Sequence, residues 1–147
     1  MLTKNIKPNA KAIIKGEKIF PYIYGEVLFY QKKDAVLVVA RISGLPKNHS
    51  GFFGFHIHDG SSCRGKQFED TGSHYNPGGK PHPKHSGDLP PLLSCDGDAY
   101  MEVKTDRFNV REIIGKTVVI HDSTDDFRSQ PSGDSGEKIA CGEIRVL

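Results

Sequence analysis

The sequence predicts an all-β domain of about eight short antiparallel strands, packed as a sandwich or barrel with two long functional loops. Three observations favour this fold class. Short segments rich in aromatic and β-branched residues recur along the chain, and several alternate apolar with polar residues. The 16 glycines and 9 prolines among 147 residues indicate many turns. No segment shows a convincing helical period.

The predicted strands follow one another through the chain. Residues 24–31 are rich in aromatic and β-branched side chains, and residues 35–42 are almost continuously apolar, as in a buried strand. Residues 11–15 and 92–94 are weaker candidates. The remaining strands are predicted at residues 51–59, 99–104, 116–121 and 138–146. Because no repeat or linker interrupts this series, we expect one domain over residues 1–147.

The strand at residues 51–59 places two histidines together. Phe53, Phe55 and Ile57 alternate with His56 and His58, so the two imidazoles share the face opposite the apolar one. Two imidazoles so placed could share a metal ion. A pair of surface or hydrogen-bonded histidines is the alternative, and the pair alone is weak support for a site.

Residues 59–91 and 121–137 do not fit the strand rhythm. Loops of this length in a small domain are usually functional. The first contains three histidines and a carboxylate, namely His74, His82, His85 and Asp88. Prolines among them argue against a helix. Three imidazoles and one carboxylate form a closed four-coordinate set suited to structural zinc. A solvated histidine-rich loop is the alternative.

His121 ends the strand at residues 116–121, where a lone histidine is more often a hydrogen-bonded strand-end residue than a ligand. His49 lies in a polar turn, and no role is assigned to it. Taken together, the sequence predicts one metal centre. It would be built from His56, His58, His74, His82, His85, Asp88 and His121.

Charge and hydropathy exclude several functions. A formal net charge of +2 without a Lys/Arg run argues against a nucleic-acid partner, and no apolar stretch is long enough for a membrane span. The first residues show no secretory signal, so we expect a cytoplasmic protein or the mature form of an exported one. Of Cys63, Cys95 and Cys141, at least one is left over if two pair, and the count alone does not indicate the compartment.

Five motifs occur in one order along the chain. They are Gly-Phe-His-Ile-His at 54–58, Ser-His-Tyr-Asn-Pro at 73–77, His-Ser-Gly-Asp-Leu at 85–89, Val-Ile-His at 119–121 and Ala-Cys-Gly at 140–142. Together they resemble the copper/zinc superoxide dismutase family over nearly the whole chain. The resemblance implies a Greek-key arrangement of the strands and dismutation of superoxide to oxygen and hydrogen peroxide. It also implies superoxide as the partner, and it is compatible with a homodimer and a copper-delivery protein.

The resemblance implies a role for each site residue. Copper would be bound by His56, His58, His74 and His121, and zinc by His74, His82, His85 and Asp88. His74 would bridge both ions and carry a proton during catalysis. Asp125 would join a copper-site imidazole to a zinc-site imidazole. Cys63 and Cys141 would form the disulfide of the family, which leaves Cys95 free.

Three departures from the family pattern matter. The zinc loop is trimmed, and residues 59–73 carry an insertion around Cys63. Lys138 replaces the arginine that guides the substrate. Lysine keeps the positive charge but lacks the planar fork, and its ammonium is expected to be more mobile, so anion guidance should be weaker. Arg128 is a second candidate for this role, and an ordinary surface lysine at 138 is the alternative.

Two other functions are compatible with the same motifs. One is a non-catalytic metal-binding or copper-delivery module, although such a module usually lacks copper ligands. The other is a structural relative that holds zinc only. Bound copper and turnover would separate these hypotheses.

Overall fold

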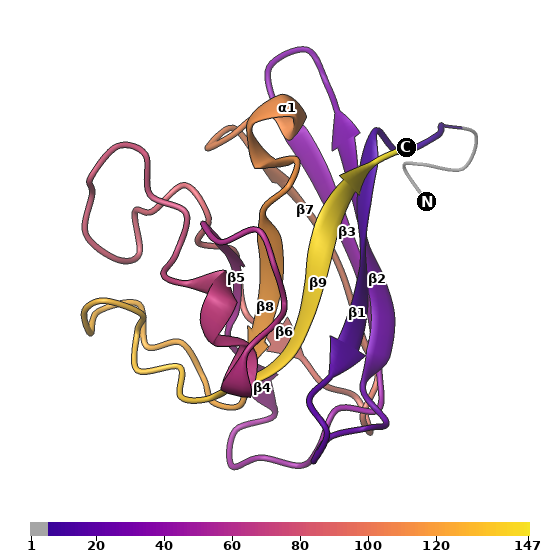
Figure 1. Ribbon diagram of the computed structural model, residues 1–147, viewed down its shortest axis with the longest axis vertical. Coiled ribbons are helices and arrows are strands. Elements are labelled where there is room, and N and C mark those ends of the chain that lie inside the picture. The colour runs from indigo at the N-terminus through magenta and orange to yellow at the C-terminus, as the bar shows by residue number, and fades with distance from the viewer. Residues whose placement is uncertain (1–5) are drawn as a thin grey trace.

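Seven of the strands form one curled antiparallel sheet in the order β5-β8-β9-β1-β2-β3-β7. The computed structural model describes residues 6–147. The seven strands are β1 (Ala10–Gly16), β2 (Tyr24–Gln31), β3 (Val36–Ser43), β5 (Phe55–His58), β7 (Ala99–Thr105), β8 (Thr117–His121) and β9 (Lys138–Val146). Figure 1 shows β5, β8 and β9 on one side and β1, β2 and β3 on the other. The predicted all-β class is confirmed.

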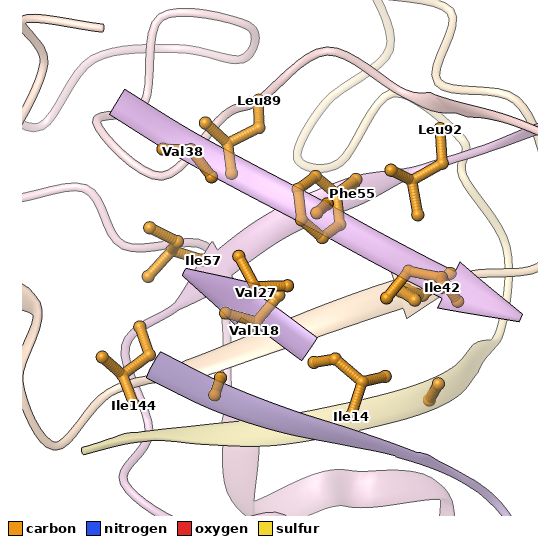
Figure 2. Close-up of a cluster of buried hydrophobic side chains, with 14 of the residues drawn as sticks. Ile14, Val27, Val38, Ile42, Phe55, Ile57, Leu89, Leu92, Val118 and Ile144 are labelled. Carbon is orange, nitrogen blue, oxygen red and sulfur yellow. The ribbon is translucent and has the colours of Figure 1, made fainter. Parts of the chain in front are cut away.

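The inner face of this sheet encloses the main hydrophobic core. Figure 2 shows Ile14, Val27 and Val118, from three different strands, converging on one interior. In β1 every second residue is buried because side chains alternate across a pleated sheet, whereas all five residues of β8 are buried. Leu89 and Leu92, which follow the histidine-rich loop, also pack in this core, so the loop is anchored next to Asp88.

The structure differs from the prediction at residues 51–59. Two short strands lie there instead of one, β4 (Phe52–Phe53) and β5, and β4 pairs with β6 (Leu92–Leu93) in a second, two-stranded sheet. Gly54 separates them. A Cβ atom at this position would lie 2.7 Å from the hydroxyl of Ser135, so any side chain here would force Ser135 to shift. The residues described therefore form nine strands.

Two long connections lie beside β5 and β8 (Figure 1). The first contains the 3-10 helix η1 (Lys66–Thr71), and the short helix α1 (Val110–Ile113) precedes β8. A disulfide between Cys63 and Cys141 ties the first connection to β9, and Cys95 is free, as predicted. Neither helix in residues 6–147 has the length and apolarity that a membrane crossing needs.

Candidate metal centre

The histidine-rich loop is joined to the sheet by backbone pairing. β5 is an edge strand, so one side of its backbone is open to partners outside the sheet. The Ile57 N–H donates to the carbonyl of Gly87 at 2.8 Å, and the Ile57 carbonyl accepts from the Tyr75 N–H at 2.8 Å. Isolated bridges also pair His56 with Asp88 and His58 with His74. This pairing places the loop histidines beside the strand histidines.

All seven residues proposed for the metal centre come together in two groups whose ligand atoms lie within 4.8 Å of one another. His74 belongs to both groups. The first group is His56, His58, His74 and His121, and the second is His74, His82, His85 and Asp88. Every one of these side chains is buried. The two predicted ligand sets are thus adjacent and share one imidazole.

In the first group, two nitrogen lone pairs face each other. Nδ1 of His58 lies 2.8 Å from the Gly72 carbonyl, and Nδ1 of His121 lies 3.2 Å from the Gly136 carbonyl. A carbonyl only accepts, so each Nδ1 carries the hydrogen and each neutral ring has its lone pair on Nε2. The two Nε2 atoms are 3.3 Å apart. A cation bound by both would relieve this repulsion.

The other two rings of this group supply nitrogens that have no protein partner. Nε2 of His56 donates to Oδ2 of Asp125 at 2.8 Å, which leaves a lone pair on Nδ1. Neither Nδ1 of His56 nor Nε2 of His74 makes a hydrogen bond among the described residues. Buried polar atoms without a partner are rare and call for an explanation. Four converging imidazole nitrogens fit a copper ion.

The second group offers three Nδ1 atoms and a carboxylate. Nδ1 of His74 lies 2.8 Å from Asp88 Oδ1 and 3.1 Å from Nδ1 of His85. Nδ1 of His82 lies 3.0 Å from Asp88 Oδ2 but makes no hydrogen bond, because Nε2 of this ring already donates to Asp125. This donor set fits tetrahedral zinc with no open position.

Asp125 links the two groups. Its Oδ2 accepts from His56, and its Oδ1 accepts from Nε2 of His82 at 2.8 Å. Burial opposes its ionisation, but hydrogen bonds from His56, His82 and the Phe127 N–H outweigh burial and lower the pKa of Asp125. Only glycine fits at position 133, where φ is +70° and a Cβ atom would lie 2.0 Å from Oδ1. Because the ionised carboxylate accepts from His56 with one oxygen and from His82 with the other, it fixes the orientation of both rings.

Burial also keeps three histidines of the first group neutral. It is the main cause that lowers the pKa of His56 to about 4 and the pKa of His121 to about 3. The pKa of His58 is likewise well below its usual value, chiefly through burial. Neutral imidazoles have the free lone pair that metal binding requires.

A cavity of about 690 Å³ opens beside the first group and is lined by His58, His74, His121 and Lys138. Nζ of Lys138 donates to the hydroxyl of Thr71 at 2.8 Å and to the Gly72 carbonyl at 3.0 Å. The ammonium is thus held, contrary to the expected mobility. Arg128 does not line this cavity.

Sequence reasoning missed two side chains near the site. Thr71 contacts Lys138, and Arg107 donates to the backbone carbonyls of Pro83 and His85 in the histidine-rich loop. No motif marks either residue. Each contacts a residue that is distant in the sequence, and only the fold brings the two partners together.

Comparison with known proteins agrees with this geometry. The family model for copper/zinc superoxide dismutase matches residues 23–144. The chain is 31% identical to superoxide dismutase [Cu-Zn] 2 of Aquifex aeolicus, over 97% of this chain and 89% of that protein. It is 36% identical to the superoxide dismutase-like protein YojM of Bacillus subtilis, over 62% of this chain and 54% of that protein. The crystal structure of a double mutant of a SOD-like protein from Bacillus subtilis matches with a TM-score of 0.78 and 27% identity, covering 92% of this chain and 96% of that one.

Proposed function

This chain belongs to the copper/zinc superoxide dismutase family, and we propose that it converts superoxide to oxygen and hydrogen peroxide at a copper ion joined through His74 to a structural zinc ion. The observation that carries the proposal is the placement of the two nitrogens of His74. Nδ1 faces His85 and Asp88 of the second group. Nε2 belongs with the histidines of the first group, and it has no hydrogen-bond partner among the described residues.

The protein residues divide the work between two ions. His56, His58, His74 and His121 would hold copper, and His74, His82, His85 and Asp88 would hold zinc. Bound copper supplies the one-electron reduction and oxidation that dismutation requires, and zinc cannot supply it. Asp125 accepts from Nε2 of His56 and from Nε2 of His82, which leaves the Nδ1 lone pair of each ring for the ion that the ring would hold.

His74 is the proposed proton carrier. Two superoxide anions and two protons give one oxygen and one hydrogen peroxide, so protons must reach the reduced product. Nε2 of His74 can hold a proton and release it toward the cavity that this residue lines. Nδ1 stays among the zinc-type donors meanwhile, so the ring remains in place.

Lys138 is the proposed attractor of the anion. Among those of residues 6–147 that line the cavity, it is the only lysine or arginine, and Asp59, the one acidic residue there, is paired with Lys116 at 2.8 Å. A positive charge inside a cleft raises the local concentration of an anionic substrate.

The test is metal content and superoxide consumption of the fully reconstituted protein. We expect one copper and one zinc per chain and rapid consumption. His74→Ala should lose activity and weaken the binding of both metals, whereas His49→Ala, which alters an exposed histidine outside the centre, should change neither. A His74→Ala protein that keeps both metals and full activity would exclude the bridge.

A non-catalytic metal-binding or copper-delivery module is the second candidate. Its support is the similarity to proteins described only as superoxide dismutase-like. The complete set of four copper-type histidines favours catalysis instead. Reconstituted protein that binds copper without consuming superoxide, and passes copper to an acceptor, would establish the second candidate.

A further inference from the structure

We propose that Thr71 is a positioning residue that, together with the Gly72 carbonyl, holds the ammonium of Lys138 as a single-donor site for a small monoanion. The inference rests on the proposed function and extends it to Thr71, which fixes the position of the Lys138 ammonium in the cavity. It concerns a side chain that no sequence motif marks.

The backbone of Lys138 is fixed beside the copper-type histidines. Lys138 begins β9, and its register partner on β8 is His121. Three residues later, Cys141 carries the disulfide to Cys63. The lysine stem therefore starts from a rigid position and reaches the cavity that His58 and His121 also line.

The ammonium is then held by two acceptors. It donates to the Thr71 hydroxyl at 2.8 Å and to the Gly72 carbonyl at 3.0 Å. An ammonium has three N–H donors, so one remains for a ligand. A lysine held this way is a fixed point charge with one available donor, unlike arginine, whose planar fork offers two parallel donors.

Thr71 is itself held in one orientation. Its side chain is fully buried, at 0% exposure, and its hydroxyl donates to the Phe68 carbonyl at 2.7 Å. With the hydroxyl hydrogen committed to Phe68, the oxygen can only accept from the ammonium. Phe68 and Gln67 adopt left-handed backbone conformations, with φ of 57° and 53°. Such conformations are uncommon for residues other than glycine and often occur at functional sites.

The segment at residues 59–73 is bonded to β9 at three places, and one of them is the Gly72 carbonyl that accepts from Lys138. Cys63 bonds covalently to β9, and Thr71 at the end of η1 contacts Lys138 at the start of the same strand. One segment therefore supplies the covalent bond that fixes the strand and the two acceptors that orient the Lys138 ammonium.

The test uses the copper- and zinc-loaded protein with azide as the probe anion. Thr71→Val removes the hydroxyl at nearly constant shape, and Thr71→Ser, the matched control, keeps a hydroxyl. Azide affinity is read from the visible absorption of the oxidised protein. The rate of acylation of the Lys138 amine by acetic anhydride, read by mass spectrometry, reports how firmly the ammonium is held.

We expect Thr71→Val to weaken azide binding by roughly threefold to tenfold, the size of one lost hydrogen bond, and to speed acylation of Lys138 severalfold. Thr71→Ser should remain within about twofold of the wild type for both readouts. In a Lys138→Ala background, Thr71→Val should have no further effect on azide. An unchanged affinity, or an equal loss in that background, would overturn the proposal.

The proposal can also be tested on the wild-type protein, and separately from the proposed function. If Thr71→Val does not fold, azide added to the wild-type protein should still slow acylation of Lys138 and leave exposed Lys18 unaffected; equal effects on both would count against the site. Neither readout requires turnover. A protein that consumes no superoxide but shows these azide effects would refute the proposed function and leave the role of Thr71 intact.

Discussion

The guanidinium of Arg107 donates a hydrogen bond to the backbone carbonyl of Pro83 at 2.7 Å, across 24 positions of sequence. The same Nη1 atom lies 3.2 Å from the carbonyl of His85. Arg107 precedes α1, whereas Pro83 and His85 belong to the histidine-rich loop. One exposed side chain thus attaches the histidine-rich loop to the segment that precedes α1.

Removing this attachment should loosen the zinc site. Arg107→Met keeps much of the side-chain length but loses both hydrogen bonds, and the exposed position limits the loss to about 1 kcal/mol. We expect zinc affinity to fall by roughly fivefold, measured by competition with a chromophoric chelator. Arg111→Met, at a neighbouring exposed arginine, is the control and should leave zinc affinity unchanged.

The Asp125 carboxylate should matter more, because it orients rings in both groups. Asn at this position has one acceptor oxygen instead of two, so either His56 or His82 loses its partner. Asp125→Asn is expected to lower metal affinity by about 10- to 100-fold. Asp134→Asn, at an exposed carboxylate in the same loop, is the matched control. Equal affinities in the two variants would refute the linking role.

The disulfide should stabilise the fold through a long chain loop. Its cysteines are 78 positions apart. In the chain-entropy model such a closure contributes roughly 4 kcal/mol, so Cys63→Ser should lower the free energy of unfolding by about that amount. Cys95→Ser alters the free, exposed cysteine and should have little effect. Urea unfolding of the metal-free, non-reduced proteins is the measurement, and a similar loss in both variants would contradict the prediction.

Metal-free protein should lose stability as the pH falls. The pKa of His56 drops on folding from 6.5 to about 4, and burial is the main cause. Protons therefore bind the unfolded chain more tightly. This contribution to stability is complete above pH 6.5, declines as pH falls, and is exhausted near pH 4. His121 extends the decline to about pH 3. Urea midpoints that stay constant from pH 7 to pH 4 would exclude this linkage.

Lys138 should affect the rate through its charge and its number of donors. Arginine at this position offers two donors to a small anion, lysine with its two protein contacts offers one, and alanine offers none. We expect Lys138→Arg to be the fastest, Lys138→Ala the slowest, and the wild-type rate to fall with added salt. The measurement is the rate constant for superoxide across a salt series. Three equal rate constants without salt dependence would mean that Lys138 does not attract or orient superoxide.

Much of the fold was predictable because strand patterns are local. The predicted strands at residues 24–31 and 138–146 match β2 and β9. Alternation at residues 51–59 also placed Phe53, Phe55 and Ile57 in the core and left His56 and His58 on the other face. The break at Gly54 was not predictable from the alternation, and only the fold brings Ser135, from a loop about 80 positions away, against this glycine.

The sequence by itself determined the residue types of the two candidate ligand groups, their order along the chain and most of the strands that hold them. Periodicity and side-chain chemistry are properties of neighbouring residues, so they can be read without the fold. Only the tertiary structure decided which lone pairs face each other, that Thr71 holds Lys138, and that Arg107 holds the histidine-rich loop. These contacts join segments far apart in the sequence, and their distances follow from how the sheet curls and where its edge strand is paired.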